Sequence, residues 1–205
     1  MASGGGANIN RQVVEFQLSP SSTLVKILRG NIAQWSFDGS SDAIVDPTNE
    51  RMLGGGGEDG AAGPQLREAC YKVPEARPGI RCPTGEARIL PGFKLAASHV
   101  ILTVGPIYAS HPDPKSALQS SYRNCFRLAK ENNIQYIAFP AISCAYYGYP
   151  FAEASKIAVS TVKEHGSDFK EKREVYEWCL QVHLVLFSDE GYDAYVKAAN
   201  ELLQN

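Results

Sequence analysis

The sequence has no excess of basic residues, no long apolar stretch and no leader-like start. Its 20 lysines and arginines stand against 22 acidic residues, a net charge of −2, which argues against general nucleic-acid binding. No apolar run approaches the ~20 residues that span a bilayer, so no membrane association is expected. The start, MASGGGANIN, has neither a basic segment nor the apolar core of a secretory signal.

Cysteine and histidine are present without the spacings of disulfide or metal chemistry. The five cysteines are odd in number and include no C-x-x-C pair, so we expect reduced thiols and a cytoplasmic or nuclear protein. The four histidines show no H-x-x-x-H or Cys/His ligand spacing. No metal site is therefore expected.

The length suits one core. A chain of 205 residues with 44% hydrophobic side chains can bury one sizeable core but is short for two ordinary domains. We expect a flexible tail at residues 1–12, followed by a single domain over residues 13–205 that acts as a monomer.

Strand and helix patterns alternate along the chain. Strands are expected at residues 13–18, 23–28, 42–46, 85–93, 98–105, 136–142 and 179–187, the first two forming one edge of a sheet. Helices are expected at residues 61–71, 116–132, 151–165 and 189–203, the last capped by Asp189. The run YIAFPAI is apolar throughout, which suits a strand covered on both faces. The pattern predicts a layered α/β fold.

Four consecutive glycines, Gly54, Gly55, Gly56 and Gly57, lie between an expected strand and an expected helix. Backbone without side chains allows a ligand to approach closely, and exposed N–H groups at a helix start bind anions. A phosphate-bearing ligand is the first candidate. A flexible surface loop is the alternative, although such a loop is rarely held so closely between a strand and a helix.

Two other phosphate-binding motifs fit this glycine run poorly. A Walker A loop needs a Lys-Ser/Thr pair, and none follows. Gly55, Gly57 and Gly60 match G-x-G-x-x-G, but eight residues separate Asp46 from Gly55, whereas the dinucleotide fingerprint follows its strand directly. An NAD-dependent oxidoreductase is therefore a remote alternative.

A second candidate loop, AISCAYYGYP, follows the apolar strand and precedes the helix expected from residue 151. If the two strands are neighbours, both loops lie at the same sheet edge and could clamp a diphosphate between two helix starts. Packing in the core is an equal alternative for Tyr146 and Tyr147.

Six segments then occur in a familiar order: DAIVDPTNERMLGGGGEDGAAGPQL, CPTGEARILPGFKL, HVILTVGP, SYRNCFRLA, IAFPAISCAYYGYP and VHLVLFSDEGYDAY. From about residue 23 to the end, this set resembles the macrodomain family, specifically its MacroD-type hydrolase branch. The resemblance implies a three-layer α/β/α domain with a mixed central sheet and a cleft for ADP-ribose. It implies no cofactor.

The resemblance also assigns residues. Asn49 matches the last asparagine of the family's N-A-A-N signature, which holds the distal ribose. Asp59 matches the aspartate that positions or activates water; without the family it would be taken as a solvated loop acid. The ligand-binding positions implied are Asn31, Ile32, Gly54, Gly55, Gly56, Gly57, Ser143, Cys144, Ala145, Tyr146, Tyr147 and Phe187, the last as the aromatic that stacks on adenine.

The sequence departs from the family pattern at several points. Asp46 replaces the first signature asparagine, and Pro-Thr replaces the two alanines. About four residues are missing after Gly60, Ala145 replaces a glycine, and Asn31 replaces an aspartate that contacts the adenine amino group. These changes threaten catalysis more than fold, because rate depends on placing water within a fraction of an ångström. Two functions follow: hydrolysis of an ADP-ribose linkage, or reading of ADP-ribose without cleavage.

Overall fold

The computed structural model describes residues 13–18, 23–53, 57–168 and 181–204, without the side chains of residues 57–59 and 166–168. The expected tail at residues 1–12 lies outside this description. Within it, no helix is both long enough and apolar enough to cross a bilayer.

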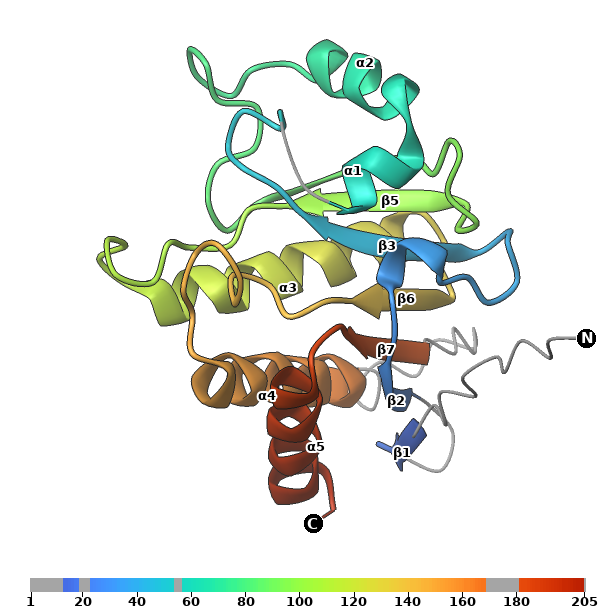
Figure 1. Cartoon of the computed structure of the whole chain (residues 1–205), viewed down its shortest axis with the longest axis vertical. Helices are drawn as coiled ribbons and strands as arrows, with labels where there is room; N and C mark the ends of the chain where they lie inside the picture. Colours follow the sequence, from blue (N-terminus) through green and yellow to red (C-terminus); the bar gives the residue numbers. More distant parts are fainter. Residues whose placement is uncertain (1–12, 19–22, 54–56, 169–180, 205) are drawn as a thin grey trace, which may run out of the picture.

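The described strands form one mixed sheet in the order β1-β2-β7-β6-β3-β5-β4, which Figure 1 shows from β5 downward to β1. The middle strands β2, β7, β6, β3 and β5 are parallel, and β1 and β4 are antiparallel edges. The bounds are β1 Val13–Gln17, β2 Leu24–Arg29, β3 Asp42–Pro47, β4 Ala87–Pro91, β5 His99–Thr103, β6 Tyr136–Phe139 and β7 Gln181–Leu186. As predicted, β1 and β2 lie at one edge of the sheet.

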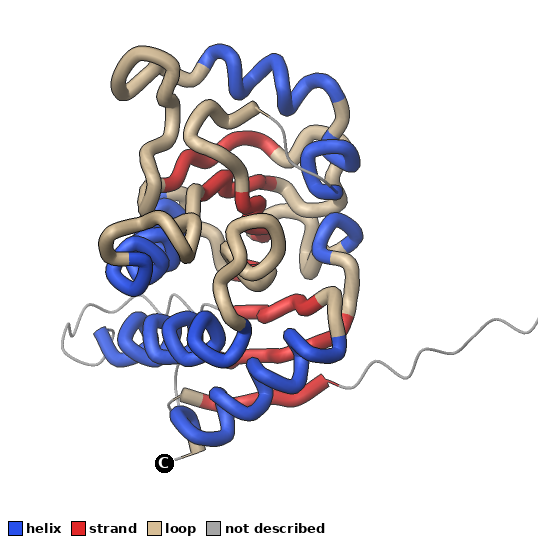
Figure 2. The backbone as a smooth tube through the Cα atoms, turned by 60° about the vertical axis from the view of Figure 1, so that its left-hand side comes forward, coloured by secondary structure: helices blue, strands red, loops and turns tan. Residues whose placement is uncertain are grey.

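Helices cover both faces of the sheet (Figure 2). One face packs against α3 Pro114–Glu131, α4 Phe151–Asp168 and α5 Asp189–Leu203; the other packs against η1 Ile32–Gln34, α1 Gly57–Ala62 and α2 Pro64–Lys72. Along β3, Ala43 and Val45 join the first core and Ile44 joins the second. Side chains that alternate between two apolar cores require helices on both faces. The predicted three-layer α/β/α fold is confirmed.

Three local predictions were wrong. The helix expected at residues 61–71 is two helices, because Gly63 has φ 80° and the following Pro64 disfavours helical backbone before it. The strand expected at residues 136–142 ends at Phe139. Ser188, not Asp189, caps α5, with its Oγ accepting from Gly191 N at 3.1 Å; Asp189 instead pairs with Arg29 at 2.8 Å.

A buried histidine on β7 makes stability depend on pH. Trp35 Nε1 donates to His183 Nδ1 at 3.1 Å, and burial lowers the pKa of His183 to about 4. Between about pH 6.5 and pH 4, His183 is therefore protonated in the unfolded chain and neutral in the folded chain.

We expect the free energy of unfolding to be level above pH 6.5 and to fall by up to about 1.4 kcal/mol per pH unit as the pH drops toward 4. Denaturant titrations across this range measure the slope. His183→Gln removes the titrating group, so a variant with the same slope as the parent would contradict the assignment.

Candidate functional site

A cavity of about 1140 Å³ lies at the carboxyl ends of the parallel strands. Gly30 follows β2, Thr48 follows β3, Gly105 lies beyond β5, Pro140 follows β6, and Phe187 follows β7; all five line it. Parallel strands end at one edge of a sheet, so segments far apart in the sequence meet there. Phe151 at the start of α4 and Glu190 at the start of α5 complete the rim.

The loop after β6 contributes the predicted residues Ser143, Cys144, Ala145, Tyr146 and Tyr147, all of which line this cavity. Ser143 has φ 66°, a conformation unfavourable for a non-glycine residue, and its buried Oγ has no hydrogen-bond partner in the described chain. A buried hydroxyl without a partner is available to a ligand. Burial raises the pKa of the Cys144 thiol to about 12, so it is not a thiolate nucleophile.

The side chains of this loop differ in exposure. Tyr146 is 99% exposed at the cavity, so the packing alternative is wrong for this residue. Tyr147 is partly buried, and burial followed by the charge of Glu50 raises its pKa. Ala145 is exposed and does not adopt a positive φ, so its methyl group adds no backbone strain.

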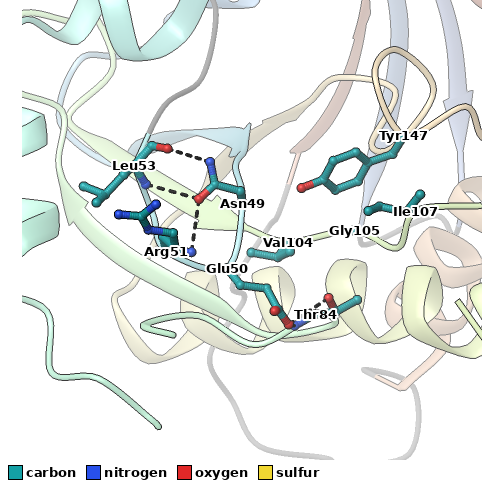
Figure 3. A pocket seen from close by; sticks show the side chains of 9 residues that line it. All are labelled: Asn49, Glu50, Arg51, Leu53, Thr84, Val104, Gly105, Ile107 and Tyr147. Atoms are coloured by element: carbon teal, nitrogen blue, oxygen red, sulfur yellow. Dashed lines mark hydrogen bonds between the residues drawn. The ribbon is translucent and has the colours of Figure 1, made fainter. Parts of the chain in front are cut away.

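The loop after β3 is organised by Asn49 (Figure 3). Its Nδ2 donates to Leu53 O at 2.6 Å, and its Oδ1 accepts from Arg51 N at 3.1 Å. Met52 within this loop is buried with φ 56°. Asn49 lines the cavity and also fixes the backbone that leads into the glycine run.

Another end of the cavity is formed by η1 and the end of β7. Asn31 caps η1, its Oδ1 accepting from Ala33 N at 3.0 Å, and Ile32 is buried. Phe187 is 83% exposed and lines the cavity, so it does not belong to the core. The predicted adenine-end residues therefore lie in one cavity with the loop after β6.

The glycine run is only partly described. Gly54, Gly55 and Gly56 lie outside the described residues, so their role is still a prediction. Gly57 begins α1, and Asp59 lies in the same helix, but its side chain is outside the description. β3 and β6 pair directly in parallel, so the condition under which both loops would lie at the same sheet edge is met.

Gly105 lines the cavity but was not predicted as a site residue from the sequence. A Cβ built at this position would meet Ser143 Oγ at 2.1 Å and Ile142 Cγ2 at 2.6 Å. The available signal was a glycine-proline pair directly after an apolar strand, a pattern typical of close backbone approach.

A second cavity of about 350 Å³ adjoins the first, and Asn49, Gly105 and Tyr147 line both. Figure 3 shows the Tyr147 hydroxyl pointing into the space that faces Asn49. The other residues that line the second cavity are Glu50, Arg51, Leu53, Thr84, Val104 and Ile107.

Metal ligation has no support in the described residues, which hold no group of three or more His, Cys, Asp or Glu side chains placed to bind an ion. The described cysteines, Cys70, Cys82, Cys125 and Cys144, are free thiols.

The layered fold and the cavity at the carboxyl edge define an α/β protein of the class that binds ligands at this edge of its sheet. The Macro domain family model matches residues 45–158. The chain belongs to the macrodomain family.

Bacterial proteins of similar length are among its relatives. A Macro domain-containing protein of Xanthomonas campestris pv. campestris is 41% identical over 85% of this chain and 94% of its own length. An O-acetyl-ADP-ribose deacetylase of Salmonella typhimurium is 41% identical over 84% of this chain and 92% of its own. The macrodomain of Oceanobacillus iheyensis solved with ADP superposes with a TM-score of 0.79 at 32% identity, covering 95% of this chain and 98% of that chain.

Proposed function

We propose that the main cavity binds ADP-ribose and that the protein hydrolyses an ADP-ribose linkage at the distal ribose. Adenine lies against Asn31, Ile32 and Phe187, the diphosphate along residues 143–147, and the distal ribose beside Asn49 and Tyr147. The observation that carries the proposal is the cavity itself, because all of the residues just named line one continuous space.

The relatives support the same ligand. The Oceanobacillus iheyensis macrodomain has been solved with ADP and, as a variant, with ADPR, the latter with a TM-score of 0.80 at 33% identity. The Salmonella relatives are named for deacetylation of O-acetyl-ADP-ribose. A protein 41% identical over most of both chains supports a hydrolase here.

In the proposed reaction, Asp59 orients and deprotonates a water that attacks the anomeric carbon of the distal ribose, while Asn49 holds the sugar. The bond from that carbon to the linked group breaks, and the departing group takes up the proton. With O-acetyl-ADP-ribose the same water attacks the acetyl carbonyl, and acetate leaves. Proton transfer by a positioned carboxylate contributes about 10²–10⁴-fold to rate. Backbone N–H groups of the two loops stabilise the diphosphate, and no metal or cofactor takes part. The candidate substrates are mono-ADP-ribosylated protein, ADP-ribosylated nucleic-acid ends and O-acetyl-ADP-ribose.

A non-catalytic reader is the second candidate, favoured by the residues missing after Gly60, directly beside Asp59. Incubation with the three substrates separates the two functions. Turnover of any one supports the hydrolase, whereas ADP-ribose binding with all three intact supports the reader.

An oxidoreductase would prefer the whole dinucleotide. Thermal-shift measurements with NAD and ADP-ribose compare the two ligands, since stabilisation follows affinity. We expect ADP-ribose to give the larger shift, and a larger shift with NAD would contradict the proposal.

Phe187→Ala is expected to weaken ADP-ribose binding by roughly 1–3 kcal/mol, the usual worth of a base–aromatic stack. Phe187 is 83% exposed, so truncation removes little packing and should leave the fold intact. Calorimetric dissociation constants measure the change.

Phe37→Ala is the matched control, because Phe37 is 48% exposed and stacks on Tyr136 away from both cavities. Equal effects of the two variants would rule out adenine stacking by Phe187.

A further inference from the structure

The second cavity lies where the proposed ligand ends. If the distal ribose sits beside Asn49 and Tyr147, which line both cavities, its anomeric carbon faces the second cavity. Any group bonded to that carbon then enters this space. The inference therefore rests on the proposed function.

One wall of the second cavity carries a fixed negative charge. Glu50 Oε1 accepts from Thr84 N at 2.9 Å and from Thr84 Oγ1 at 3.1 Å. The Glu50 backbone carbonyl accepts from Arg81 N at 2.8 Å and from Cys82 N at 3.0 Å. With both its backbone and its carboxylate bonded to the loop before β4, Glu50 is held at this wall.

The charge acts on the shared end of the two cavities. Glu50 is one of the causes that raise the pKa of Tyr147, whose hydroxyl points toward Asn49 (Figure 3). The other walls include the apolar Val104 and Ile107 and one cationic residue, Arg51.

The neighbouring cations offset this charge weakly. Arg77 Nη2 lies 3.8 Å from Glu50 Oε1, but its side chain is 62% exposed, and exposed pairs are well screened by water. Arg81 pairs with Glu75 at 3.2 Å. The Arg51 side chain points away from the Tyr147 hydroxyl in Figure 3.

We propose that the second cavity receives the group bonded to the distal ribose, and that the Glu50 carboxylate makes it select neutral or cationic groups over anionic ones such as phosphate. Amino, hydroxyl and amide donors can bond to Glu50 or to Tyr147. A phosphate at the same carbon is repelled.

The test compares calorimetric dissociation constants of ADP-ribose and ADP-ribose 1″-phosphate at low ionic strength, so it needs no catalysis. We expect the parent protein to bind the phosphate about five- to twentyfold more weakly than ADP-ribose, the size of one repulsion between partly exposed charges. Glu50→Gln should remove most of this difference, since its amide oxygen can still accept from Thr84.

Glu75→Gln is the matched control, because it removes the same charge from the same surface but lines neither cavity. Melting temperatures check that both variants fold. The subsite alone would be overturned if the parent protein bound ADP-ribose 1″-phosphate as tightly as ADP-ribose. It would also be overturned if the ratio of the two dissociation constants were the same in Glu50→Gln and Glu75→Gln. Absence of binding by either ligand would overturn the proposed function and the subsite with it.

Discussion

Asp59→Ala is expected to lower kcat by about 10²–10⁴-fold, the usual contribution of a positioned acid–base group. In the proposed reaction this carboxylate orients the attacking water, whereas adenine stacking and the diphosphate contacts supply affinity. The dissociation constant of ADP-ribose should therefore change little. Single-turnover rates on O-acetyl-ADP-ribose and on mono-ADP-ribosylated protein, measured beside calorimetry, separate the two effects.

Glu58→Ala is the matched control for this experiment, because it removes the same charge from the neighbouring position of α1. It should retain most of the parent rate. Equal rates for the parent and Asp59→Ala would remove Asp59 from the mechanism. Equal losses in both variants would indicate that the net charge of α1, not a positioned carboxylate, matters.

Gly105→Ala is expected to damage both cavities at once. Its Cβ would lie 2.1 Å from Ser143 Oγ and 2.6 Å from Ile142 Cγ2. The serine hydroxyl can rotate, but Ile142 is fully buried and cannot yield without moving the core. We expect the free energy of unfolding to fall by about 1–3 kcal/mol, as in other overpacked sites.

The same substitution should weaken ADP-ribose binding at least about tenfold, or about 1.4 kcal/mol, because residues 143–147 must shift. Chemical denaturation and calorimetry measure the two losses. Gly30→Ala is the control for stability, since a Cβ there meets only Val185 Cγ1 at an ordinary 3.6 Å. If Gly105→Ala were as stable as the parent and bound ADP-ribose as tightly, the close approach of Gly105 to Ile142 and Ser143 would be unimportant.

The sequence predicted the order of the strands and helices because their apolar periods are regular. It left open whether the strands before the two candidate loops are neighbours, and only the structure shows that β3 and β6 pair directly. It did not predict the break at Gly63, where one φ angle overrides good helix-forming residues on either side. The Gly-Pro pair was the local signal for this break, since glycine allows a positive φ and proline disfavours helical backbone in the residue before it.

The candidate site was predicted through family resemblance more than through pattern. Ser143 and Phe187 would each be unremarkable in an unknown chain, and only the fold shows that they line one cavity. Gly105 and Glu50 were missed for a different reason. Their importance comes from contacts across the sheet edge, with Ser143 for the glycine and with Thr84 for the glutamate, and no local pattern encodes those contacts.

Calorimetric titration of the full chain with ADP-ribose decides whether the main cavity binds this ligand. We expect saturable one-to-one binding well below millimolar ligand. No measurable heat or stabilisation at millimolar ADP-ribose would contradict it.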